Sequence, residues 1–166
     1  MSDACMEMAN PVFMKQQNKQ IDIILLNSGG IRSIIPKGNI TKRNAFEVMP
    51  FENSLIVIAL KGEQIKALAQ HIITEKKPHP LNGLKIILNK ENVITNILFK
   101  DQPIENNEIY YVGTSDYLAN GGDNMTFFLK NEGTYDLNYK IRNVLIDYFY
   151  IHKTIEASNS PRIIKE

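Results

Sequence analysis

The 166-residue sequence has little of several features, and each scarcity excludes a class of protein. It contains a single cysteine, Cys5, so no disulfide can form within the chain. No apolar run approaches the roughly 20 residues of a membrane-spanning helix, and the first residues lack the basic start and apolar block of a signal peptide. Neither charge dominates, because 19 basic and 18 acidic residues give a net charge of +1. The sequence therefore predicts no nucleic-acid partner and no membrane span.

The pattern of apolar residues predicts one α+β domain, a mixed β-sheet with flanking helices. We expect a short helix over residues 2–9, with Ser2 as its cap and Pro11 ending it, and a second that begins after Thr41 and ends before Pro50. Two longer helices are predicted over 62–77 and 139–152. Strands are predicted over 21–27, 54–62, 83–89, 93–99 and 108–115, the last three forming a meander, and the tail 156–166 is predicted to be irregular.

Glycine is also sparse, with nine residues, yet it is doubled at Gly29-Gly30 and again at Gly121-Gly122. Each pair follows an apolar run that reads as a strand. Glycine there lets the backbone adopt positive φ or lets a ligand approach closely, but two tight turns would explain the pairs equally well. The same alternative holds for nearby residues: Asn27 and Asp123 could be turn or cap residues, and Phe51 and Tyr117 could be packed aromatics.

Taken together, the residues around the two glycine pairs are the parts of a nucleoside site. The first loop contains an amide and Arg32, the second contains Asp123, and "PFEN" and "DYLAN" each set an aromatic ring beside polar residues. Stacking of a base on an aromatic ring contributes roughly 1–3 kcal/mol. A carboxylate accepts hydrogen bonds from ribose hydroxyls, and a guanidinium pairs with phosphate.

Two stretches resemble the C-terminal domain of the 5'-nucleotidase family. "DIILLNSGGIRSIIPKGNITKRNAFEVMPFENSLIVIALKGEQIKAL" contains, in order and at the expected spacing, the family's Asn-x-Gly-Gly-Ile-Arg, Ile-Pro-x-Gly-x-Ile-Thr and Pro-Phe-x-Asn-x-Leu blocks and a glycine that opens a helix. "YYVGTSDYLANGGDNMTFF" is similar to the family's second signature, which ends in Leu-Ala-x-Gly-Gly-Asp. The resemblance covers nearly the whole chain, so residues 1–166 are expected to form one such domain.

The resemblance assigns substrate-binding roles to ten residues. It implies that Phe51 and Tyr117 hold the base between their rings and that purines bind better than pyrimidines. It implies further that Asp123 holds the ribose hydroxyls and that the glycines admit the nucleoside. The family more often has Phe where Tyr117 stands. By the same resemblance, Asn27 and Asn53 would reach the base or sugar edge, and Arg32 would face the ribose–phosphate side. The ten residues are Asn27, Gly29, Gly30, Arg32, Phe51, Asn53, Tyr117, Gly121, Gly122 and Asp123.

The family's catalytic machinery has no counterpart in this sequence. In the family, a separate N-terminal metallophosphoesterase domain holds two divalent metal ions and hydrolyses the phosphoester. The three histidines here, His71, His79 and His152, have no metal-ligand spacing with Asp or Glu. The sequence predicts no catalytic residue, no metal site and no cofactor in this chain, which alone should be inactive. The first helix also looks shortened at its start.

The resemblance therefore predicts the substrate-specificity domain of a nucleotidase, a 2',3'-cyclic phosphodiesterase or a nucleotide-sugar hydrolase. Its partners would be a nucleotide or nucleoside and the metallophosphoesterase domain, and its location periplasmic, secreted or at the cell surface. Two alternatives remain. One is a stand-alone nucleoside-binding module without catalysis. The other is a structural or interaction domain with an unused pocket, or one that serves a related sulfur-oxidation hydrolase.

Overall fold

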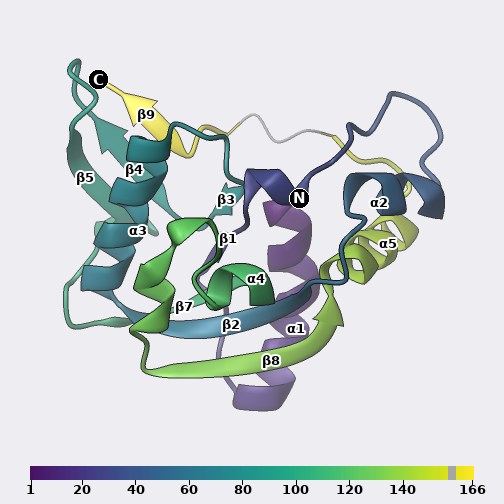
Figure 1. Cartoon of the computed structure of the whole chain (residues 1–166), viewed down its shortest axis with the longest axis horizontal. Coiled ribbons are helices and arrows are strands. Elements are labelled where there is room, and N and C mark those ends of the chain that lie inside the picture. The colour runs from purple at the N-terminus through teal and green to yellow at the C-terminus, as the bar shows by residue number, and fades with distance from the viewer. Residues whose placement is uncertain (157–159) are drawn as a thin grey trace.

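The computed structural model describes residues 1–156 and 160–166, which form two β-sheets with helices packed against them (Figure 1). The larger sheet has the strand order β3-β1-β7-β2-β8 and the smaller one the order β6-β5-β4-β9. Both are mixed, because β1 runs parallel to β7, and β4 to β9, while the other pairs are antiparallel. The prediction of one α+β domain with flanking helices is confirmed, with two sheets in place of one.

The strands of the larger sheet are β1 (Ile23–Leu25), β2 (Ser54–Lys61), β3 (Leu81–Asn82), β7 (Ile109–Ser115) and β8 (Gly133–Lys140). Those of the smaller sheet are β4 (Lys85–Leu88), β5 (Ile94–Phe99), β6 (Gln102–Pro103) and β9 (Ile163–Lys165). The α-helices are α1 (Ser2–Gln17), α2 (Lys42–Val48), α3 (Gly62–Glu75), α4 (Asp116–Ala119) and α5 (Ile141–Ile151), and short 3₁₀ turns are η1 (Ser28–Gly30), η2 (Gly122–Asn124) and η3 (Thr126–Leu129). None of the described helices is long and apolar enough to cross a membrane.

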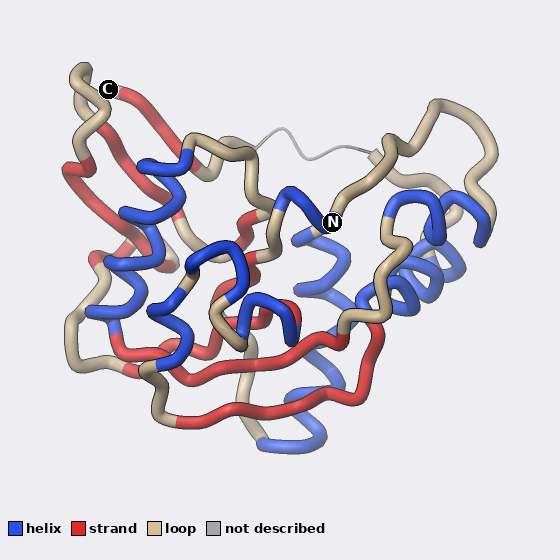
Figure 2. Tube along the Cα trace, in the orientation of Figure 1, coloured by secondary structure: helices blue, strands red, loops and turns tan. Residues whose placement is uncertain are grey.

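Strand β2 lies between the two halves of the core and contributes residues to both. Its apolar residues are buried on both faces, as the unbroken run over 54–62 predicts. Ile56, Ile58 and Leu60 pack in a cluster with α3, η3 and the smaller sheet. Leu55 and Val57 point the other way, into a cluster with α1, α2 and α5. The larger sheet is therefore the middle layer of the molecule, with helices on both sides (Figure 2).

The first helix is longer than predicted. It continues through Pro11 to Gln17, although proline removes one hydrogen bond of the helix and crowds the preceding turn. Its buried face, which includes Ala9 and Phe13 on either side of the proline, packs in the core and outweighs that cost. Ser2 is not its cap, because the Ser2 hydroxyl donates to the carbonyl of Leu81, 3.2 Å away, and so links α1 to β3.

The predicted meander is wrong in its third strand. Residues 83–89 and 93–99 pair as β4 and β5, but β7 lies in the other sheet, between β1 and β2. Its burial on both faces suits a central strand, and the two-residue β6 takes its place beside β5. The tail is not wholly irregular, because β9 pairs with β4; residues 157–159 of the predicted tail lie outside the described part. Strand β8 was not predicted, and β1 is shorter than residues 21–27.

The other helix predictions are confirmed. Helix α2 begins after Thr41, whose backbone N–H donates to the Asn44 side chain at 2.8 Å, and it ends before Pro50. Helix α3 ends two residues earlier than predicted, and α5 occupies most of residues 139–152.

Candidate functional site

One edge of the larger sheet brings three loops together. Strands β1 and β7 are parallel, so both of their carboxyl ends lie at this edge, and β2 is antiparallel to β7, so it begins there. The loop after β1, the loop after β7 and the segment before β2 therefore converge, although they are far apart in sequence. They surround a cavity of about 260 Å³ lined by Leu26, Asn27, Gly29, Gly30, Met49, Phe51, Asn53, Ser115, Tyr117, Asp123 and Ile141.

Seven of the ten residues predicted for the site line this cavity. The exceptions are Arg32, Gly121 and Gly122. Arg32 is exposed, and its guanidinium lies 3.5 Å from the carbonyl oxygen of Gly29, at the cavity's edge. Gly121 and Gly122 line a separate shallow depression together with Asp116, Tyr117 and Asn120. The structure thus brings the two sequence signatures together, while their binding roles stay predictions.

The two aromatic rings of the cavity are partly exposed. Phe51 is 43% exposed and Tyr117 is 46% exposed. Among the described residues, neither ring packs against another aromatic ring. Two partly exposed rings that line one cavity without an aromatic partner are expected at a ligand site rather than in a core.

The first glycine loop is short and folds over the end of β1. Residues Ser28–Gly30 form a 3₁₀ turn in which the Gly30 N–H donates to the carbonyl of Asn27 at 3.2 Å. The Ser28 N–H donates to Nδ1 of His79, 3.3 Å away in the segment before β3. Burial lowers the pKa of His79, which favours the neutral ring that this acceptor role requires.

The second glycine loop is built around the Tyr117 ring. Its hydroxyl donates to Oδ1 of Asp123 at 2.9 Å and accepts from the Asp123 N–H at 3.2 Å. Gly121 has a φ of 84°, in the left-handed region that favours glycine. A Cβ atom on Gly122 would lie 2.6 Å from the Tyr117 ring. The loop therefore packs against Tyr117, which also lines the cavity.

The two asparagines of the cavity offer free polar groups. Within the described residues, neither the Asn27 nor the Asn53 carboxamide makes a hydrogen bond. The backbone of Asn53 is fixed, because its carbonyl accepts from the Ile141 N–H at 3.0 Å. Each carboxamide can both donate and accept, as the edge of a nucleobase or the sugar hydroxyls would require.

Sequence reasoning missed four lining residues, Leu26, Met49, Ser115 and Ile141. Three are apolar and buried, so their sequence signal is that of core residues. Ser115 caps α4, accepting the Leu118 N–H at 3.2 Å, and its place directly before Asp116 could have pointed to it. Sequence reasoning also missed residues outside the cavity that stabilise its loops through hydrogen bonds, such as His79. Contacts between loops leave no periodic pattern in the sequence.

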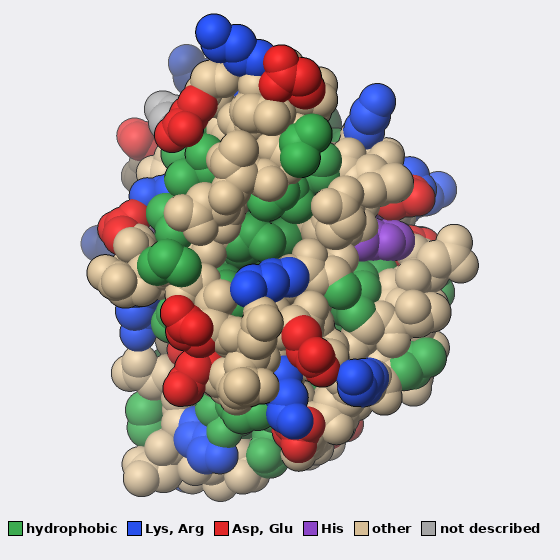
Figure 3. All heavy atoms as spheres, turned by 90° about the vertical axis from the view of Figure 1, so that its left-hand side faces the viewer, with side chains coloured by type: hydrophobic (Ala, Val, Ile, Leu, Met, Phe, Trp, Pro, Cys, Tyr) green, Lys and Arg blue, Asp and Glu red, His purple; other side chains and the backbone are tan. Residues whose placement is uncertain are grey.

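No metal site is visible in the part of the chain that the structure describes, where no three His, Cys, Asp or Glu side chains gather to hold an ion. His71 lies on α3 with its ring 5.8 Å from that of Phe127, and His152 pairs with Glu7. Burial raises the pKa of Cys5 to about 12, so its thiol stays protonated. Figure 3 shows one face of the molecule, over α3 and the smaller sheet, where basic and acidic side chains are interspersed without a stripe of one sign.

Comparison with known proteins gives a consistent family. A family model described as "5'-nucleotidase, C-terminal domain" matches residues 2–130. An apyrase of Tabanus yao is 26% identical over 163 residues, which cover 86% of this chain and 29% of the apyrase. The NAD 5'-nucleotidase of Haemophilus influenzae is 29% identical over 136 residues, covering 70% of this chain and 22% of that protein.

A solved structure extends the similarity to the fold of the whole chain. The 5'-nucleotidase precursor from Thermus thermophilus superposes with a TM-score of 0.83 at 26% identity, covering 99% of this chain and 35% of that one. The chain thus spans less than a third of these two curated relatives and about a third of the solved structure.

Proposed function

The chain belongs to the family of 5'-nucleotidase C-terminal domains, and from this premise we propose that it is the substrate-specificity domain of a phosphoric-ester hydrolase acting on nucleotides. The observation that carries the proposal is the pair of exposed rings, Phe51 and Tyr117, on one cavity that also contains a carboxylate and two free carboxamides. These groups suit a nucleoside, which has flat aromatic faces, a polar base edge and two vicinal hydroxyls.

In this proposal each wall of the cavity binds a different part of the ligand. The base stacks between Phe51 and Tyr117, each ring contributing roughly 1–3 kcal/mol. Asp123 accepts from the ribose hydroxyls, while Asn27 and Asn53 reach the base or sugar edge. Arg32, exposed at the rim, faces the phosphate. Purines bind better than pyrimidines because they offer the rings more stacking area.

Hydrolysis would be carried out by a separate N-terminal metallophosphoesterase domain, whose two divalent metal ions would supply an activated water molecule and neutralise charge on the phosphoryl oxygens. This chain's share of catalysis is to hold the nucleoside so that the phosphate is presented in a fixed orientation. The whole protein would act in the periplasm, outside the cell or at its surface, as the family resemblance implies.

Titration of the 166-residue chain with adenosine and AMP, followed by NMR, tests the binding proposal. Phe51→Ala and Tyr117→Ala should each weaken binding by roughly 1–3 kcal/mol. Phe51→Ala should leave folding stability nearly unchanged because its ring is partly exposed, whereas Tyr117→Ala should also lose about 0.5–1 kcal/mol of stability that the Tyr117 hydroxyl contributes. A core phenylalanine would instead cost about 3–5 kcal/mol of stability when truncated. Tyr150→Ala, at a 90% exposed position on α5, is the matched control. Equal binding by the control and both cavity variants would refute the proposal.

A stand-alone nucleoside-binding module is the second candidate, because one chain supplies every side chain that lines the cavity. The two candidates agree that this chain alone will not hydrolyse AMP with added Mn²⁺, Zn²⁺ or Co²⁺. Turnover that co-elutes with the protein through repeated purification would contradict both. Adding a metallophosphoesterase domain of a relative separates them: only a specificity domain should then change which nucleotides are hydrolysed.

A further inference from the structure

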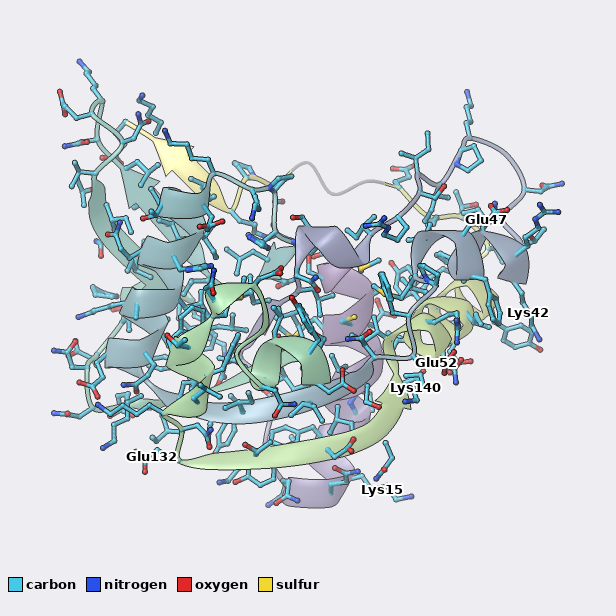
Figure 4. All side chains as sticks on the ribbon, viewed as in Figure 1. Lys15, Lys42, Glu47, Glu52, Glu132 and Lys140 are labelled. Atoms are coloured by element: carbon cyan, nitrogen blue, oxygen red, sulfur yellow. The ribbon has the colours of Figure 1, made fainter. Side chains whose placement is uncertain are left out.

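The segment that carries Phe51 has no regular structure, yet three of its carbonyl groups accept hydrogen bonds from adjacent residues of one other segment. Residues 50–53 connect α2 to β2. The Pro50 carbonyl accepts from Nη1 of Arg142 at 3.2 Å, that of Glu52 from Nζ of Lys140 at 2.6 Å, and that of Asn53 from the Ile141 N–H at 3.0 Å. Three consecutive residues at the junction of β8 and α5 therefore hold the turn. Figure 4 shows Glu52 and Lys140 close together at this junction.

Arg142 combines a full charge with almost complete burial. It is 7% exposed, and its Nη2 also donates to the carboxylate of Glu52, whose side chain is 70% exposed. Its guanidinium carbon lies 4.2 Å from the centre of the Phe46 ring, in a cation–π contact. Its Nε is buried and has no hydrogen-bond partner among the described residues.

Burying a guanidinium in this way is costly, and an apolar side chain of similar length would fill the same space at less cost. Filling space between α2 and α5 therefore does not explain the residue. The fork geometry does, because the rigid guanidinium donates from Nη1 to the Pro50 carbonyl and from Nη2 to the Glu52 carboxylate at once. These two acceptors belong to the residues that flank Phe51, so Arg142 holds the backbone before the ring directly and contacts the residue after it through the Glu52 side chain.

The far end of the same segment is tied to the other ring. Oδ2 of Asp116 accepts from the Ser54 N–H at 3.1 Å, and Oδ1 accepts from the Tyr117 N–H at 2.8 Å. One carboxylate thus joins the start of β2 to the residue that carries the second ring. Side chains outside the cavity, Arg142 and Asp116, therefore contact the backbone next to both rings.

We propose that Arg142 is a positioning residue, which acts through the Phe51 turn to hold the Phe51 ring at a fixed distance from Tyr117. The inference rests on the proposed nucleoside site, where a fixed gap lets a base enter without first ordering the turn. Preorganisation of this kind favours binding because the cost of immobilising a side chain is already met in the free protein.

The first test needs no ligand. Arg142→Met removes the charge and the donors but keeps a flexible apolar chain beneath Phe46. Backbone ¹⁵N relaxation should then show the order parameters of residues 51–53 falling from the rigid value of about 0.85 toward about 0.6. Arg43→Met, at an exposed arginine on α2 paired with Glu47, is the matched control and should change nothing there. A turn that stays as rigid as in the wild type overturns the proposal.

The second test measures adenosine affinity. Arg142→Met should weaken binding by roughly 2- to 10-fold, the effect of leaving one or two side chains to be ordered. In a Phe51→Ala background the same substitution should have no further effect, because the ring through which it acts is gone. A merely structural role predicts equal losses in both backgrounds, and that result would overturn the proposal.

The proposal remains testable if the variant does not fold or if the wild type does not bind nucleosides. If Arg142→Met does not fold, Glu52→Ala removes the ion pair from the exposed side, and the same loss of order at residues 51–53 is expected. A turn left rigid by Glu52→Ala then counts against the proposal. If the wild type binds no nucleoside, the proposed function fails, while the ligand-free relaxation experiment still decides whether Arg142 holds the turn.

Discussion

The two double-glycine loops look alike in the sequence but meet different physical requirements. In the first loop, a Cβ atom on Gly29 or Gly30 would approach the Asn27 side chain most closely, at 3.5 and 3.1 Å. Neither residue has a positive φ. In the second loop, Gly121 has a φ of 84°, and a Cβ atom on Gly122 would lie 2.6 Å from both the Tyr117 ring and the Tyr117 carbonyl oxygen.

The difference shows that one motif can serve two purposes. The first pair keeps a cavity wall free of side chains, with His79 holding the turn from behind. The second pair packs against the Tyr117 ring, and Asp123, which follows it, accepts a hydrogen bond from the Tyr117 hydroxyl. The first pair lines the cavity and the second pair packs against Tyr117, while the expectation that all four glycines admit the nucleoside stays a prediction.

Substitutions at the polar side chains of the two loops should give the largest contrast in nucleoside binding. Asp123→Asn removes the negative charge but keeps an oxygen acceptor and a residue that tolerates the left-handed φ of 51°. We expect a loss of roughly 1.5–3 kcal/mol in adenosine binding, the range for hydrogen bonds to charged groups, and no remaining preference for ribo- over 2'-deoxynucleosides. Asn27→Ala, in the first loop, should cost only about 0.5–1.5 kcal/mol. Calorimetric titration measures both, and a ribose preference that survives Asp123→Asn would contradict the assignment.

The glycines themselves give the next largest contrast. Gly122→Ala forces the added methyl group into Tyr117 and should lower the free energy of unfolding by about 1–3 kcal/mol. Gly29→Ala places its methyl group at ordinary contact distance and should stay within about 0.5 kcal/mol of the wild type. Urea denaturation of the two variants provides the comparison. Equal effects would mean that the two loops are equivalent after all.

The same contrast explains what the sequence could and could not predict. The strands that border the cavity could be predicted, because β1 and β7 lie in apolar runs that lead into the two loops, and β2 is an unbroken apolar run. The placement of β7 in the larger sheet could not, since strand order depends on packing between distant segments. Pro11 misled for the same reason: the core contacts of α1 outweigh a local helix breaker.

Within the candidate site, the residues that face the cavity carried signals in their motifs, whereas their supports did not. Arg142 appears in the sequence as an ordinary polar position at the start of a helix, and His79 as a loop residue between two prolines. Their importance comes from backbone groups that they contact 51 to 92 positions away. No local pattern encodes such contacts.

The hydrogen bond that His79 accepts from the Ser28 N–H, which supports the first loop, should depend on pH. Burial is the main cause that lowers the pKa of His79 below its usual value of 6.5. The Leu26 backbone and Asp123 oppose this shift, while His71 and Lys77 act in the same direction. Because the folded-state pKa is depressed, the stability contribution is complete above about pH 6.5 and is lost as the pH falls through the folded-state pKa. Protonation of Nδ1 would also remove the acceptor of the Ser28 N–H, a hydrogen bond that contributes about 0.5–1.5 kcal/mol.

Urea denaturation between about pH 5 and 8, the range in which histidine titrates, measures this effect. His79→Gln retains an acceptor but cannot titrate, so its stability should fall less steeply than that of the wild type as the pH drops. His152→Gln, at a histidine on the surface paired with Glu7, is the control for the general loss of histidine charge. Identical pH profiles for the wild type and His79→Gln would show that His79 does not cause the dependence.

The support of the second loop should give the smallest effect, and it sharpens the comparison most. Tyr117→Phe keeps the ring but removes the hydroxyl that bonds to both the carboxylate and the N–H of Asp123. These bonds are exposed to solvent, so we expect a loss of about 0.5–1 kcal/mol in stability and faster hydrogen exchange at the Asp123 N–H. Adenosine binding should stay close to that of the wild type, because the stacking surface is unchanged. The first loop has no such bond to a ring hydroxyl, and its amides should exchange as in the wild type. If Tyr117→Phe binds as poorly as Tyr117→Ala, the hydroxyl rather than the ring face recognises the ligand, and the stacking arrangement is wrong.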